Sequence, residues 1–121
     1  MKNARRRAFR LPLMAAFMTC KRAKDGKTVA HSLDFDLVTV ADDEARAFQK
    51  LRLAVKTYIE YGLSNNWVED IVFPAPRDYW EYFLAAKSIQ SMEPIQIEDD
   101  RMIVVRATIA DNEHRQISCP A

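Results

Sequence analysis

The side chains that do acid–base or metal chemistry are few in this sequence. The two histidines, His31 and His114, have 82 residues between them, and neither has a carboxylate at metal-ligand spacing such as i+4. His31 shares one face of an apolar segment with Val29 and Leu33. This pattern is typical of a core or interface histidine with one hydrogen bond, so we expect neither a metal ligand nor a catalytic base.

The cysteines are equally weak candidates for a nucleophile. Cys20 ends an apolar stretch, where a cysteine is usually an inert small side chain. Lys21 and Arg22 favour its thiolate, but no histidine near it in the sequence completes a nucleophilic pair. Because Cys119 is the one other cysteine, we expect neither a disulfide framework nor a paired-cysteine metal site.

Acidic side chains occur in three groups, of which one is a candidate site. Asp34 and Asp36 share a face and suit a divalent cation, but no glycine-punctuated loop supports one. The groups at residues 42–44 and 98–100 are typical of a helix start and a hairpin turn. Two glycines in the whole chain exclude the glycine-rich loops that bind nucleotide phosphates. We therefore expect no catalytic residue, no metal and no cofactor, and predict that the protein is not an enzyme.

The composition is that of one folded domain. The 121 residues are 49% hydrophobic and 29% charged, which argues against intrinsic disorder. The longest nearly apolar stretch, residues 11–20, is shorter than the roughly 20 residues that a membrane-spanning helix needs. Basic residues precede this stretch as in a signal peptide, but no small-residue cleavage site follows it. We expect a cytoplasmic protein without a membrane contact.

Charge is distributed unevenly along the chain. Through Lys27 there are nine basic residues and one acid, a net charge of +8, whereas nine bases and 16 acids follow, a net charge of −7. A basic head suits an anionic partner or an acidic surface, including that of another copy of the chain. As the alternative function we consider nucleic-acid binding by the N-terminal arm and the first turn. Its candidate residues are Arg5, Arg6, Arg7, Arg10, Lys21, Arg22, Lys24 and Lys27.

Hydrophobic periodicity predicts an α+β fold. Alternation predicts strands over residues 9–20, 28–33 and 37–40, and a three-to-four spacing predicts a helix from about residue 43 to 61. Asp42 or Asp43 is expected to cap this helix and Gly62 to end it. The pattern gives a three-stranded antiparallel sheet with one packed long helix, plus a C-terminal helix at residues 77–88 and a hairpin of residues 94–98 and 102–109.

The expected organisation is one domain with two polar ends. It comprises a basic arm at residues 1–8, a domain at 9–110 that divides into 9–62 and 63–110, and a polar tail at 111–121.

Aromatic residues gather in the second predicted helix, next to acids that would repel phosphates. We therefore interpret them as a lid on the core or an oligomer contact. They are Tyr79, Trp80, Tyr82 and Phe83.

The first half of the chain resembles the HicB-like antitoxin domain, a partial double-stranded-RNA-binding-like fold. The resemblance rests on the turn Lys24-Asp25-Gly26, on Leu33-Asp34-Phe35 before the third strand, and on a helix that begins at Glu44-Ala45 and ends near Tyr58. Asp34-Phe35-Asp36 stands where the family has Pro-Gly, and a hairpin stands where many members append a DNA-binding module. The resemblance implies a regulatory protein that engages a small basic toxin-like protein through its sheet and helix.

Surplus apolar surface predicts where a partner binds. A first strand that is apolar on both faces, together with Leu53 on the polar side of the long helix, exceeds what one helix covers. The predicted partner-binding residues are therefore Met14, Ala16, Met18 and Leu53. Because open sheet edges tend to pair and two-fold dimers are the commonest closed assembly, we expect a homodimer with these residues near the contact.

Overall fold

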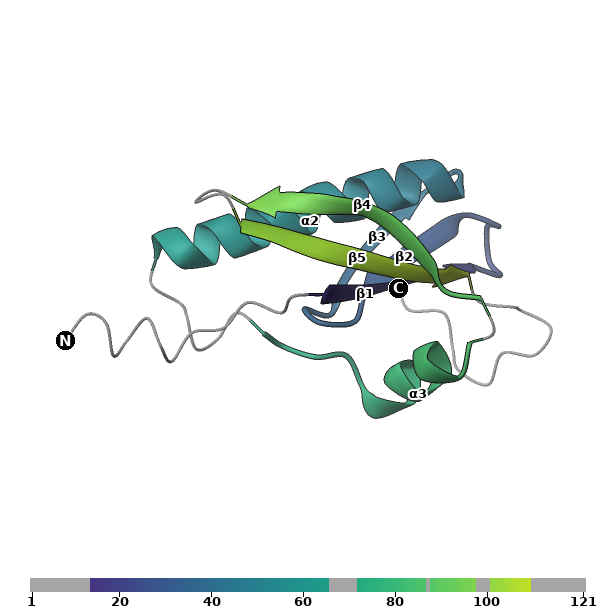
Figure 1. Ribbon diagram of the computed structural model, residues 1–121. Coiled ribbons are helices and arrows are strands. Elements are labelled where there is room, and N and C mark those ends of the chain that lie inside the picture. The colour runs from purple at the N-terminus through teal and green to yellow at the C-terminus, as the bar shows by residue number, and fades with distance from the viewer. Residues whose placement is uncertain (1–13, 66–71, 87, 98–100, 110–121) are drawn as a thin grey trace.

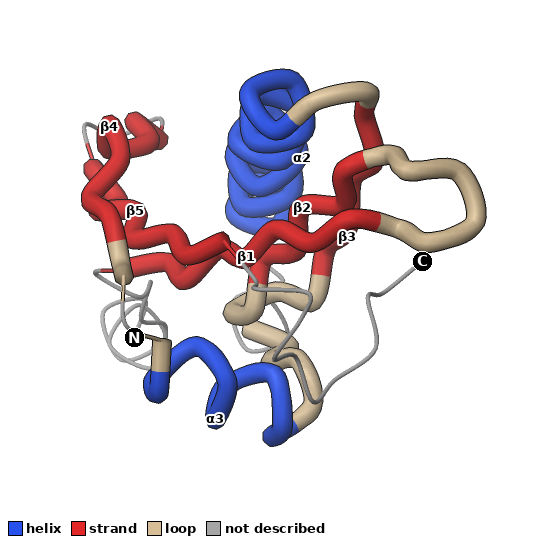
Figure 2. Tube along the Cα trace, turned by 90° about the vertical axis from the view of Figure 1, so that its right-hand side faces the viewer, coloured by secondary structure: helices blue, strands red, loops and turns tan. Residues whose placement is uncertain are grey.

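The computed structural model describes residues 14–65, 72–86, 88–97 and 101–109. The elements are β1 (Met14–Lys21), β2 (Thr28–Ser32), β3 (Leu37–Ala41), α2 (Glu44–Ser64), α3 (Arg77–Ala85), β4 (Gln90–Ile97) and β5 (Arg101–Ile109). The five strands form one mixed sheet in the order β3-β2-β1-β5-β4, with α2 on one face and α3 on the other (Figures 1 and 2). The predicted basic arm and polar tail lie outside the described residues.

The α+β class is confirmed, but the predicted three-stranded antiparallel sheet is wrong. The C-terminal hairpin joins the same sheet, because β5 pairs in parallel with β1 while β1 also pairs antiparallel with β2. β1 is therefore the central strand, which explains why it is apolar on both faces. The sequence pattern revealed the hairpin without revealing that its second strand pairs with the first strand of the chain.

Residue parity in β1 divides the core into two layers. Ala15 and Phe17 point toward α2, and Ala16 and Met18 point toward α3. The larger layer contains the buried stripe of α2 and the inward residues of β4 and β5. Each alternate residue of β1 thus belongs to a different layer, as the period of two in a strand requires.

The long helix α2 supplies most of the larger layer. Its buried residues include Leu51, Val55 and Ile59 at spacings of three and four, as the sequence predicts. Asp43 is the N-cap, since its carboxylate accepts a hydrogen bond of 2.8 Å from the backbone N–H of Arg46.

The expected end of α2 is wrong. Gly62 is buried within the last turn of the helix, which ends at Ser64 with Asn65 as C-cap. The side-chain amide of Asn65 donates to the Tyr61 carbonyl at 2.8 Å, so the orphan carbonyls of the last turn find a donor without a glycine.

Candidate functional site

Helix α3 forms a lid over one half of the sheet face opposite α2. Its Phe83 is buried against Ala16, Met18 and Leu33, with the other aromatic residues of α3 packed around this cluster. The interpretation of these aromatics as a lid on the core is confirmed. Ala16 and Met18 lie beneath α3 rather than at the surface, so their prediction as partner-binding residues is wrong.

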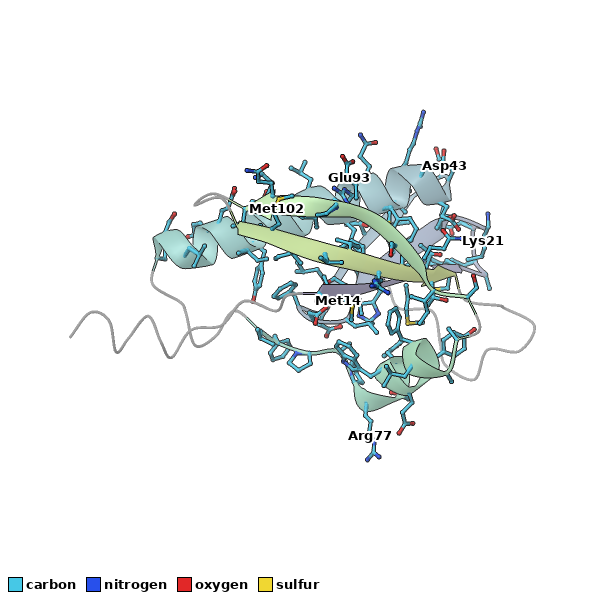
Figure 3. The ribbon with its side chains drawn as sticks, viewed as in Figure 1. Met14, Lys21, Asp43, Arg77, Glu93 and Met102 are labelled. Atoms are coloured by element: carbon cyan, nitrogen blue, oxygen red, sulfur yellow. The ribbon has the colours of Figure 1, made fainter. Side chains whose placement is uncertain are left out.

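No described helix covers the other half of this sheet face. Met14 on β1 and Val104 on β5 are neighbours in the parallel register, and Met102 lies two residues before Val104 on the same face. Their exposed fractions are 44%, 40% and 51%. Among the residues that the structure describes, these three form an apolar surface across two paired strands, which we call the open sheet patch; Figure 3 labels Met14 and Met102.

Sequence reasoning found one of the three patch residues. Met14 was predicted to bind a partner, whereas Met102 and Val104 were missed. The signal was present, since Met102 and Val104 alternate with the inward-facing Ile103 and Val105. Two apolar residues on the polar side of a strand indicate either a second layer or a binding surface.

A turn of four residues, Leu33–Asp36, anchors the segment that leads into α3. The backbone N–H of Phe73 donates to the Asp34 carbonyl at 3.1 Å, and that of Ala75 donates to the Leu33 carbonyl at 2.8 Å. On the other side, the Asp34 carboxylate accepts a hydrogen bond of 2.7 Å from the backbone N–H of Ala16. Burial raises the pKa of Asp34 to about 6, although this hydrogen bond favours the ionised form. Asp34 thus ties the turn to the backbone of β1.

His31 is buried under α3 beside this turn. Its Nε2 lies 2.7 Å from the Asp36 carboxylate, and the ring of Tyr79 meets it edge-on at 4.9 Å between centroids. Asp36 adopts a positive φ of 53°, a left-handed conformation that aspartate adopts more readily than most residues. The prediction of a core histidine with one hydrogen bond is confirmed, because its Nδ1 is buried without a partner.

Cys20 is disulfide-bonded, so its interpretation as an inert small side chain is wrong. The second cysteine of the sequence, Cys119, lies outside the described residues. A disulfide-bonded sulfur has no thiolate to attack a substrate, so Cys20 is no nucleophile in this state. Disulfides are rare in cytosolic proteins, so the predicted cytoplasmic location stays a prediction.

Leu53 borders a groove of about 430 Å³ between α2 and the edge strand β4. The groove is lined by Gln49, Arg52, Leu53, Lys56, Ile95 and Gln96. Leu53 is 65% exposed, as the sequence predicts for an apolar residue on the polar side of the helix. Side chains of Arg52 and Lys56 reach across to backbone carbonyls of β4 and hold the two walls together.

The basic residues of the first turn are partly paired. Arg22 donates to the Asp25 carboxylate at 2.7 Å, which lowers the pKa of Asp25 to about 2. Lys27 lies 3.8 Å from Asp42, and Lys21 and Lys24 are exposed. The other four candidates, Arg5, Arg6, Arg7 and Arg10, lie outside the described residues. Because Asp25 and Asp42 neutralise part of this charge, the described residues give the nucleic-acid alternative little support, and it stays a prediction.

Comparison with known proteins yields no relative. No protein family, no curated protein and no solved structure matches this chain. No helix within the described ranges is long and apolar enough to cross a membrane. The same residues contain no group of three or more histidine, cysteine, aspartate or glutamate side chains placed to hold a metal ion.

Proposed function

We propose that this protein is a non-enzymatic binding module that resembles a HicB-like antitoxin and engages a protein partner through the open sheet patch. The observation that carries the proposal is the patch itself. Met14, Met102 and Val104 leave three large apolar side chains in water on adjoining strands, while α3 covers the neighbouring half of the same face. Contiguous exposed apolar surface of this kind is typical of protein interaction sites.

The order of elements supports the resemblance. The chain runs β1, β2, β3 and then α2, and the three strands are antiparallel neighbours with the helix packed on one face. This is the arrangement that the resemblance implies for residues 9–62. The partner that it implies is a small basic toxin-like protein.

Co-expression with the product of the adjacent gene tests the proposal. We expect a stable complex that survives purification, and we expect the double variant Met102→Lys/Val104→Lys to lose it, since two ammonium groups in the patch repel a basic partner. Ala45→Lys is the control, because Ala45 is exposed at the start of α2, on the opposite face of the sheet from the patch. Recovery of this chain alone in every case would contradict the proposal.

A further inference from the structure

The groove between α2 and β4 has the chemistry of a second binding surface, on the face of the sheet opposite the open sheet patch. Ile95 is buried at its base, Leu53 stands at its rim, and no carboxylate is among the six residues that line it. Glu60 pairs with Lys56, so Arg52, Lys56 and Glu60 together give this side of the groove a net charge of +1. An apolar floor beside a net positive charge fits a segment that carries an apolar side chain next to acids.

The two cations of the groove are held in place. The Arg52 guanidinium donates to the carbonyls of Glu93 and Pro94, and the Lys56 ammonium donates to the Gln96 carbonyl at 2.7 Å and to Glu60 at 2.8 Å. A guanidinium has five N–H donors and an ammonium three, so donors remain for a carboxylate on a bound segment. Because the side chains are already fixed, binding such a segment costs little further side-chain entropy.

The same contacts exclude one kind of occupant. β4 is an edge strand, and an added strand would need its outward carbonyls. Arg52 and Lys56 take carbonyls of β4, and Pro94 has no N–H to donate. The groove is therefore suited to a helix rather than to an extra strand.

A helix of the required chemistry is present on the far side of the molecule. On the outer side of α3, Asp78, Glu81 and Leu84 follow one another at a spacing of three residues, which places them on one face. Leu84 is 73% exposed and Asp78 is also exposed. Arg77, which Figure 3 shows pointing away from the sheet, pairs with Glu81 at 2.9 Å, so this face has a net charge of −1.

We infer that the α2–β4 groove binds the outer face of α3 from a second copy of this chain, with Leu84 against Leu53 and Ile95, and with Asp78 and Glu81 near Arg52 and Lys56. Within one molecule the sheet separates α2 from α3, so the contact forms between copies (Figure 2). Because the two surfaces differ and lie on opposite faces, the contact is head-to-tail. It builds a ring or an open chain of molecules, in contrast to the two-fold dimer predicted from the sequence.

Complementation between two defective variants tests this inference by sedimentation velocity over a range of protein concentrations. Leu53→Gln removes the apolar contact from the groove and leaves α3 intact, and Leu84→Gln does the reverse. Both leucines are exposed, and glutamine suits a helix, so both variants keep the fold. The wild type is expected to grow beyond a dimer with concentration and to dissociate in high salt, whereas each variant stays at the 14.0 kDa of a monomer.

A 1:1 mixture of the two variants distinguishes a head-to-tail contact from any symmetric one. One intact groove and one intact α3 face remain in the mixture, so it is expected to form a dimer and nothing larger. Met102→Gln is the control and is expected to assemble like the wild type. The inference is overturned by a wild type that stays monomeric, by assembly that survives Leu53→Gln or Leu84→Gln, by a mixture that stays monomeric, or by assembly that depends on Met102.

Discussion

Replacing Asp34 by asparagine isolates the cost of burying a carboxylate in the turn beneath α3. The pKa of Asp34 is raised from its ordinary value of 3.8 to about 6, and burial is the main cause. The folded state therefore binds this proton more tightly than the unfolded chain does. The contribution of Asp34 to the free energy of unfolding is largest below pH 4, falls as the pH rises from about 4 to about 6, and stays constant above that.

The size of the effect follows from the shift. Raising the pKa by about two, at about 1.4 kcal/mol per pKa unit, gives an upper bound of about 3 kcal/mol for the effect on the free energy of unfolding. Because the side chain is only partly buried, solvent screening reduces this to about 1–2 kcal/mol. In the Asp34→Asn variant, the oxygen of the new side-chain amide still accepts the hydrogen bond from the backbone N–H of Ala16. We therefore expect this variant to be more stable than the wild type by about 1–2 kcal/mol at pH 7 and equally stable near pH 4.

Urea unfolding between pH 4 and pH 8, followed by tryptophan fluorescence, measures this difference. Asp42→Asn is the control, since the Asp42 side chain is 72% exposed and its replacement is expected to leave the pH dependence unchanged. An Asp34→Asn variant that is less stable than the wild type at pH 7, or a stability difference that does not change with pH, would refute the reasoning.

Three further predictions concern the core, the disulfide and the alternative function. Leu51→Ala is expected to lower the free energy of unfolding by about 2–5 kcal/mol, because the Leu51 side chain is fully buried between α2 and the sheet. Urea unfolding measures the loss, and a change below about 1 kcal/mol would contradict the packing. Cys20 is expected to resist alkylation until the unfolded protein is reduced, and mass spectrometry that finds it modified without reductant would contradict the disulfide. We expect no gel shift with RNA or duplex DNA at low salt; a shift that salt removes and that Lys21→Gln/Lys24→Gln weakens would favour the nucleic-acid alternative.

Local patterns predicted the elements of this fold well, because they depend on neighbouring residues. The buried stripe of α2, the cap at Asp43 and the turn at Gly26, whose φ is +71°, all follow from spacing and side-chain chemistry. The pairing of β5 with β1 joins residues about 90 positions apart, and no local pattern encodes it. For that reason the predicted sheet had three strands instead of five.

The candidate site shows the same limit. Leu53 was found because an apolar residue on a polar helix face breaks a local pattern. Ala16 and Met18 were misassigned, since only the packing of α3 on the sheet shows what covers them. Met102 and Val104 were missed because their exposure depends on how far that helix extends over the face.

The most direct test of the central claim is the affinity of the open sheet patch for its protein partner. Isothermal titration calorimetry of the full chain against the small basic product of the adjacent gene is expected to give saturable binding. Met102→Lys/Val104→Lys is expected to weaken it about 100-fold or more, as loss of two central apolar contacts does, while Ala45→Lys on α2 leaves it unchanged. Equal affinity of the wild type and the patch variant, or no heat of binding from the wild type, would contradict the account.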